Sequence, residues 1–271
     1  MTARRIGLVA WHVLKQNVRD RVLYSIAAFA LLLVAAALVI DQMTAGQDLK
    51  IIKDLGLAAI ELAGVLMSVF VGVSLVAHEI DRRSIFNVLS KPLPRWEFIV
   101  GKYSGLVMTL AMNVAALTGV LYLTLFWMGS TSPDNVRLSW EAPATDPRLL
   151  VSVGLMTAEL ALLTAIALFF STFSSSAMLS AVLTVGLFIA GLESDALRQF
   201  SLTVDAPVAG RLVTTVGWLV PAFSLFDVKT EVVHGLPINP GRIWFSLAYA
   251  AVYSFVAITA AVLVFSRREF R

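Results

Sequence analysis

Six long apolar stretches alternate with short polar segments along the chain. Each stretch is close to the roughly 20 residues that a helix needs to cross a hydrocarbon core of about 30 Å. The pattern therefore predicts an all-α integral membrane protein, a single transmembrane domain over residues 1–271. The predicted spans are Val22–Ile40, Leu55–Ala77, Tyr103–Met128, Leu149–Phe173, Ala177–Leu192 and Ile243–Phe265.

A further apolar run, Leu212–Phe226, is ambiguous because it has only about 15 residues and contains Pro221. The basic residues decide the case, since Lys and Arg favour short cytoplasmic loops. With six spans, 13 of the 21 Lys and Arg residues are cytoplasmic. A seventh span would move the basic C-terminal segment outside. We therefore expect six transmembrane helices with the N- and C-termini in the cytoplasm.

Composition agrees with a membrane protein and excludes several other classes. Hydrophobic residues make up 58% of the chain and charged residues 14%, with a mean hydropathy of +0.83. Soluble domains carry about 25% charged residues. The net charge of +3 does not indicate a nucleic-acid partner, because the basic residues lie at the ends of apolar runs. The absence of cysteine excludes disulfides, thiolate metal sites and thiol catalysis.

Residues 1–20 precede the first span and have an amphipathic helical pattern. A basic amphipathic helix at this place lies in the headgroup plane of the bilayer. We expect an N-terminal interfacial helix, and the alternative is a topogenic anchor that contacts no partner. The polar residues that fall on one arc are Arg4, Arg5, His12, Lys15, Gln16 and Arg19.

The segment 78–102 joins the second and third spans and is the one sizeable cytoplasmic loop of the predicted arrangement. Its residues Ile80–Ser90 predict a short helix, with Ile85, Phe86 and Leu89 on one face. An apolar face on a cytoplasmic helix must be covered. The cover is either the membrane surface or a soluble protein.

Charges and prolines surround this predicted helix. Glu79 can form an ion pair with Arg82 or Arg83, because residues three or four apart are neighbours on a helix. Pro92 and Pro94 end the helix, since proline cannot donate an interior hydrogen bond. The loop thus combines an apolar face, flanking charges and a fixed shape.

Four segments in this order resemble the type-2 ABC exporter permeases. They are "VRDRVLY" before the first span, "HEIDRRSIFNVLSKPLPRWEFIVGKYSGL", "WLVPAFSLFDVKTEVVHG", and "FSRREF" at the end of the last span. The similarity covers nearly the whole chain, and the order of the segments carries it more than any one motif. Within that family, the chain is similar to permeases of copper-enzyme maturation and gliding-motility systems.

The resemblance implies the membrane subunit of an ABC transporter in the cytoplasmic (inner) membrane. A second copy of the chain and two cytoplasmic ATP-binding cassette subunits would complete it, and ATP and Mg would bind to those subunits. The loop 78–102 would be a coupling loop that docks on the ATPase. The docking residues that it implies are Glu79, Arg82, Arg83, Ile85, Phe86, Leu89, Ser90, Pro92 and Arg95.

The chain shows no motif for chemistry of its own. Gly101-Lys102 is followed by tyrosine and lacks the upstream glycine of a phosphate-binding loop. Glu231 and His234 form one Glu-x-x-His pair, whereas di-metal bundles need two pairs and further carboxylates. We expect no catalytic residue, metal or cofactor in this chain.

Two carboxylates lie inside predicted spans. Glu159 is about eleven residues, or 16 Å, into its span, and Glu61 is nearer the outer boundary. An ionised group at such depth costs several kcal/mol, so it faces a cavity or a partner, or stays protonated. Glu159 either lines a conduit, with Glu61 and Asn113 as further candidates, or is protonated and hydrogen-bonded to a neighbouring helix, with Asn113, Thr118 and Thr164 as available partners.

The sequence favours an ATP-driven permease that works as a dimer. The alternative is a membrane scaffold that recruits a cytoplasmic protein and transports nothing. A secondary transporter fits less well because no internal repeat is evident. In the outer region 193–242, the run Leu212–Phe226 is expected to pack against the outer ends of the spans and to form a gate, a dimer contact or a dock for a periplasmic protein. Its role and the substrate stay open at this point.

Overall fold

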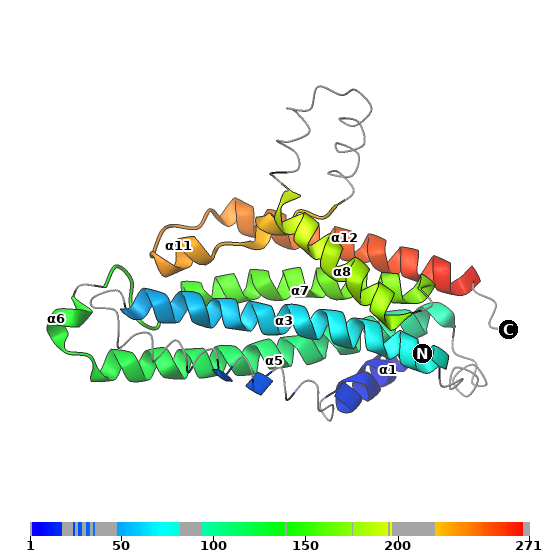
Figure 1. Ribbon diagram of the computed structural model, residues 1–271, viewed down its shortest axis with the longest axis horizontal. Helices are drawn as coiled ribbons and strands as arrows, with labels where there is room; N and C mark the ends of the chain where they lie inside the picture. Colours follow the sequence, from blue (N-terminus) through cyan, green and yellow to red (C-terminus); the bar gives the residue numbers. More distant parts are fainter. Residues whose placement is uncertain are drawn as a thin grey trace, which may run out of the picture.

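The computed structural model describes residues 2–17, 48–81, 94–138, 140–174, 176–194 and 220–267, with a few isolated positions between them. Within these ranges the regular structure is entirely helical (Figure 1). The elements are α1 (Thr2–Asn17), α3 (Asp48–Asp81), α5 (Arg95–Thr131), α6 (Asp134–Arg137), α7 (Arg148–Phe173), α8 (Ala177–Leu192), the 3₁₀ turn η1 (Phe223–Phe226), α11 (Lys229–Val233) and α12 (Pro240–Arg267).

In the described part of the chain, four helices are long and apolar enough to cross a membrane: α3, α5, α7 and α12. They contain the predicted spans that begin at Leu55, Tyr103, Leu149 and Ile243. α8 coincides with the predicted fifth span, but its 16 residues cover only about 24 Å. The first predicted span, Val22–Ile40, lies outside the described residues except for six helical positions. The all-helical membrane class is confirmed, and the number six stays a prediction.

α7 forms the middle of the bundle, with α3 and α5 on one side and α12 on the other (Figure 1). Every residue from Leu162 to Leu168 is buried, which covers all sides of the helix over nearly two turns. A helix that is apolar all round is normally buried in this way. α12 instead exposes large apolar side chains such as Trp244 and Phe255, as expected for a surface that faces lipid. The core therefore surrounds α7.

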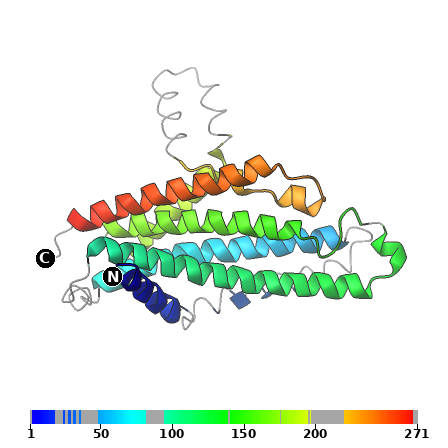
Figure 2. The same cartoon turned by 180° about the vertical axis from the view of Figure 1, so that it is seen from behind.

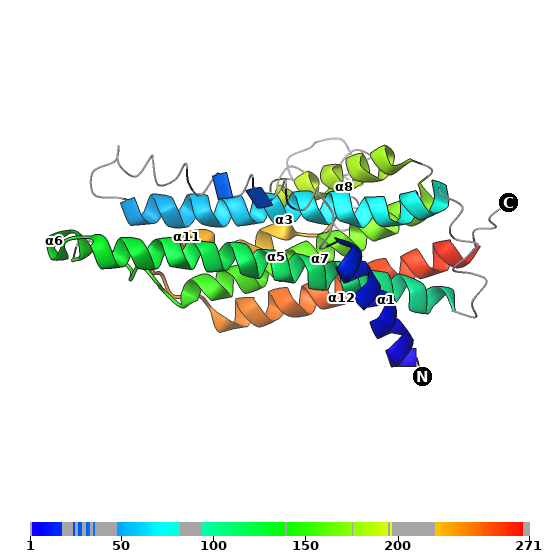
Figure 3. The same ribbon diagram turned by 90° about the horizontal axis from the view of Figure 1, so that it is seen from below.

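α1 packs obliquely across α5 (Figure 3). Gly101 and Gly105 lie one turn apart on α5 and allow the two backbones to approach closely. A Cβ atom at Gly105 would lie only 2.6 Å from the carbonyl oxygen of Ala10 and 2.7 Å from Cβ of Val13. Small residues at this spacing are common where membrane helices cross closely. The predicted N-terminal helix is thus present and contacts the bundle, and its place in the headgroup plane stays a prediction.

α1, the end of α3, the start of α5 and the end of α12 meet at one end of the bundle (Figure 2). Arg95 at the start of α5 donates hydrogen bonds to the carbonyls of Phe265 and Ser266, at 3.2 and 2.8 Å. Arg5 of α1 lies 4.0 Å from Glu97 of α5. The described segments that were predicted to be cytoplasmic therefore share one end, and α6 lies at the opposite end.

Candidate functional site

A cavity of about 580 Å³ lies between α3, α7, α8 and the segment that contains η1 and α11. Charged side chains from several elements line it: Glu61 from α3, Glu159 from α7, Glu193 after α8, and Asp227 and Lys229 at the start of α11. Four carboxyl groups and one ammonium group are among its described lining residues, so acidic groups outnumber basic ones in this acidic cavity. It brings charged groups together beside apolar side chains of the bundle.

Glu159 is the most deeply buried charged residue of the acidic cavity. Its side chain comes from the middle of α7 and the residue is 3% exposed. Oε1 has no hydrogen-bond partner within the described ranges. A buried acceptor without a partner costs about 1–3 kcal/mol, and more when it is charged. Glu159 therefore lines the cavity, and its Oε1 is a fully buried acceptor that the rest of the described chain does not satisfy.

Glu61 has a partner of opposite charge. The Nζ atom of Lys229 donates a hydrogen bond to Oε2 of Glu61, and it also lies 3.9 Å from Asp227. Burial by itself would lower the pKa of Lys229, but the hydrogen bond and charge of Glu61, together with Asp227 and Glu159, raise the pKa above its ordinary value. The ammonium group thus stays charged inside the cavity. The site accommodates an alkylammonium group that the chain itself supplies.

The segment that carries Lys229 is fixed by packing against α8. Gly191, near the end of α8, leaves no room for a side chain, because a Cβ there would lie 2.4 Å from both the carbonyl oxygen of Pro221 and Cδ2 of Phe223. The ring of Phe223 lies 5.1 Å from that of Phe188 on α8, with 57° between the planes. Phe188 and Phe223 also line the acidic cavity.

α12 holds the same segment from the other side. Arg242 donates to the carbonyl of Asp227 at 2.7 Å and to Glu231 at 2.8 Å. Ser246 donates to the carbonyl of Leu225 at 2.9 Å. Because the segment is held by both helices, the position of Lys229 is set by the fold and not by its ion pair alone.

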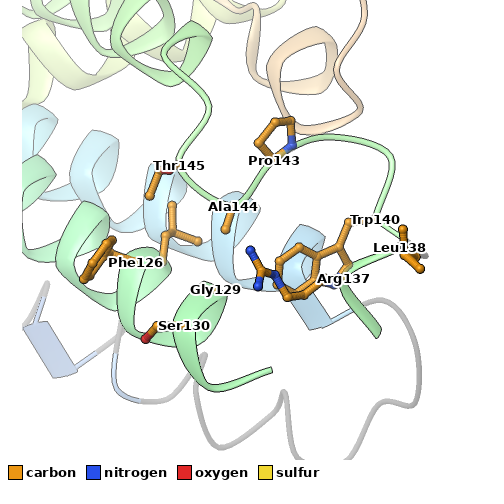
Figure 4. A pocket seen from close by; sticks show the side chains of 10 residues that line it. Phe126, Gly129, Ser130, Arg137, Leu138, Trp140, Pro143, Ala144 and Thr145 are labelled. Atoms are coloured by element: carbon orange, nitrogen blue, oxygen red, sulfur yellow. The ribbon is translucent and has the colours of Figure 1, made fainter. Parts of the chain in front are cut away.

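A second hollow of about 820 Å³ lies between the end of α5 and the loop that joins α5 to α7 (Figure 4). Phe126 and Ser130 come from α5, Arg137 ends α6, and Trp140 and Pro143 come from the loop that follows α6. None of its described lining residues is a carboxylate. This hollow lacks the deep, unpaired charge that distinguishes the acidic cavity.

The three residues predicted to line a conduit do not all lie at the acidic cavity. Glu61 and Glu159 line the same cavity, whereas Asn113 is not among the described lining residues. Asn113, Thr118 and Thr164 each donate to the carbonyl oxygen four residues earlier in their own helix, at 2.8, 2.7 and 2.7 Å. The acceptor Oε1 of Glu159 is left without these expected donors.

Most of the predicted docking residues cannot be placed. α3 continues through Glu79 to Asp81, and Arg95 begins α5 and bonds to α12. Most of the run Leu212–Phe226 is likewise outside the described part, which resumes at Val220. The docking assignments stay predictions. The docking residues outside the described ranges are Arg82, Arg83, Ile85, Phe86, Leu89, Ser90 and Pro92.

Sequence reasoning missed Glu193, Asp227 and Lys229 as lining residues of the acidic cavity. The available signal was their position beside apolar segments: Glu193 directly follows α8, and Asp227 follows the run that ends at Phe226. That signal identifies residues near the end of an apolar segment, but it does not predict which other residues their side chains contact.

Comparison with protein families gives one result. The model of a family described as "ABC-2 family transporter protein" matches residues 8–270, almost the whole chain. The comparison with curated proteins gives no match.

Proposed function

The chain belongs to the ABC-2 family of transporter proteins, and on that premise we propose that it works as a dimer driven by a separate cytoplasmic ATPase. Family membership and the long apolar helices identify a multi-pass membrane protein, the permease subunit of an ABC transporter. The family also implies an ATP-binding cassette partner. The match over residues 8–270 is the observation that carries this function.

The proposed assembly contains two copies of this chain and two ATPase subunits in the cytoplasmic (inner) membrane. ATP and Mg bind to the ATPase subunits, and hydrolysis takes place there. The loop 78–102 docks on the ATPase, with Phe86 and Leu89 as buried contacts and Arg83 at the rim. Interface energy is typically concentrated in a few such aromatic, apolar and arginine side chains. Two observations support docking through this loop: its sequence pattern, and the position of its flanking helices at one end of the bundle (Figure 2).

α3 connects the proposed docking loop to the acidic cavity. The helix is continuous from Asp48 to Asp81, and Glu61 lies about 30 Å along it from Asp81. α3 also packs closely on α7, since a Cβ at Gly72 would lie 2.8 Å from Cβ of Ala167. A displacement at the loop would therefore move Glu61 relative to Lys229, which belongs to another element. This arrangement supports transmission of the ATPase movement to the cavity.

The acidic cavity is the proposed substrate conduit, with Glu159 and Glu61 as lining residues. A non-transporting scaffold is the alternative, and it accounts for a docking loop equally well. A scaffold has no use for a chamber with an unsatisfied carboxylate at mid-bundle, because that group costs stability. The cavity therefore favours transport.

The test is co-expression with a candidate ABC ATPase subunit, followed by copurification and ATPase assays in detergent and in lipid vesicles. We expect Phe86→Ala and Leu89→Ala to weaken association by about 2 kcal/mol each if they are hot spots. Phe255→Ala and Leu263→Ala on the exposed face of α12 are matched controls and should leave association unchanged.

Two outcomes would contradict the proposal. An ATPase that stays bound and stimulated at the level of the unaltered chain in both loop variants would remove the docking assignment. An ATPase that binds normally but whose turnover ignores Glu159→Gln, and that supports no transport, would favour the scaffold.

A further inference from the structure

We propose that the acidic cavity binds a primary ammonium ion with an apolar body, and that the side chain of Lys229 competes with this ligand. The proposal rests on the function argued above and deepens it by naming a substrate class. Its basis is the combination of excess negative charge, one unsatisfied buried carboxylate oxygen and an alkylammonium group already present.

The charge of the cavity selects a cation. Glu61, Glu193 and Asp227 outnumber the single ammonium of Lys229 even when the buried Glu159 is protonated, so an anionic ligand would meet repulsion and a cation would gain attraction. Oε1 of Glu159 lacks a donor within the described residues, and an ammonium group would supply one as a charge-assisted hydrogen bond. A neutral donor could also form a hydrogen bond with Glu159, but it would gain no attraction from the excess negative charge.

The remaining lining selects an organic cation. No group of three or more potential metal ligands occurs in the described ranges, so these carboxylates do not converge as an ion-binding cluster. Leu62, Val65, Phe188, Leu192 and Phe223 provide an apolar surface beside the carboxylates. Cavities of about 300–1,000 Å³ hold drug-sized ligands, and 580 Å³ falls within that range. Aromatic rings beside the site also suit a cation.

Lys229 shows which chemistry the site accepts. Its butylammonium side chain enters the cavity and binds Glu61. A bound ligand ammonium at Glu159 would feel the positive charge of Lys229, and removal of that charge would leave Glu61 available as well. Lys229 therefore lowers affinity for the ligand while it keeps the empty cavity partly neutralised.

The experiment uses 4-phenylbutylamine, a cation at pH 7.5, and the neutral 4-phenylbutanol, which has similar length and still donates a hydrogen bond. Binding to the purified full chain is measured by isothermal titration calorimetry, with detergent alone as the blank. We expect the amine to bind roughly tenfold or more tightly than the alcohol, and Glu159→Gln to weaken amine binding by a similar factor. Lys229→Met should strengthen amine binding several-fold.

Glu141→Gln is the matched control, because Glu141 pairs with Lys50, has an exposed side chain and is not among the described lining residues. Unchanged affinity is expected there. Equal binding of amine and alcohol, no binding of the amine, or weakened binding in a folded Lys229→Met chain would each overturn the proposal. The Lys229→Met measurement keeps Glu159 intact, so it decides the matter even if Glu159→Gln fails to fold.

The ATPase distinguishes this proposal from the function on which it rests. Phe86→Ala should weaken ATPase association and retain amine binding. Absent amine binding with normal ATPase coupling would remove only the substrate class. Amine binding without any association with an ABC ATPase would remove only the proposed permease function.

Discussion

Replacement of Gly105 by alanine should release α1 from α5. The added Cβ would lie 2.6 Å from the carbonyl oxygen of Ala10, 2.7 Å from Cβ of Val13 and 2.9 Å from its Cγ1. Comfortable contacts between such atoms are about 3.5–4.0 Å, so α1 would have to move by close to an ångström. The first obstacle is a backbone atom, which no change of rotamer can remove.

The two opposing contributions can be estimated. Overpacking of a well-packed contact costs about 1–3 kcal/mol. Exchange of a helical glycine for alanine gains about 1 kcal/mol from helix propensity. We therefore expect a net destabilisation of up to about 2 kcal/mol at Gly105. Gly119 on the same helix has no atom within 4 Å of its added Cβ, so Gly119→Ala should be neutral or stabilising.

The assay compares both variants with the unaltered chain in the same detergent. Thermal denaturation reports stability, and hydrogen exchange measured by mass spectrometry reports opening of α1. Gly105→Ala should lower the denaturation midpoint and speed exchange over residues 2–17, while Gly119→Ala should do neither. If the two variants behave alike in both measurements, α1 does not pack on α5 as described.

Three further predictions concern the rest of the chain. Gly191→Ala should destabilise the chain, because its Cβ would meet a carbonyl oxygen at 2.4 Å, whereas Gly186→Ala on the same helix has open space; comparison of their denaturation midpoints checks this. Reporter fusions after Arg271 should report the cytoplasm and fusions within 134–146 the outside, and an external C-terminus would contradict the six-span topology. The pKa of Lys229 is raised above its ordinary value of 10.5. The stability that its ion pair contributes is therefore fully present below pH 10.5 and is lost only as the pH rises through the higher pKa of the folded chain. The difference in denaturation midpoint between the unaltered chain and Lys229→Met should therefore be constant from pH 7 to 9.

The spans were readable from the sequence because the hydrocarbon core fixes their length and composition. The predicted Leu149–Phe173 and Ala177–Leu192 agree with α7 and α8 to within one residue. α5 extends beyond its prediction, from Arg95 to Thr131, because its polar ends continue the helix outside the apolar window. Hydropathy detects the apolar part of a helix and does not detect polar turns that extend it, as at both ends of α5.

The burial of Glu159 could also be predicted from the sequence, because a residue so deep in an apolar run is far from either polar end of its helix. The expected hydrogen bonds from Asn113, Thr118 and Thr164 were wrong for a local reason. In an apolar helix the carbonyl four residues earlier is always within reach, so these side chains bond to their own backbone. For Asn113 and Thr118 the carboxyl group of Glu159 is on another helix, and for Thr164 it is five residues away on α7, so the backbone carbonyl is the nearer acceptor in each case.

The composition of the acidic cavity was not readable, because it depends on contacts between residues far apart in the chain. Lys229 and Glu61 are separated by 168 positions, and the space between them is set by how η1 and α11 pack on α8 and α12. That packing depends on one glycine at the end of α8, a residue that hydropathy treats as neutral. A lysine after an apolar run is ordinarily an interfacial anchor. Here the same residue enters the bundle, because the turn before it is held by both helices, and its charge then determines what else the cavity can bind.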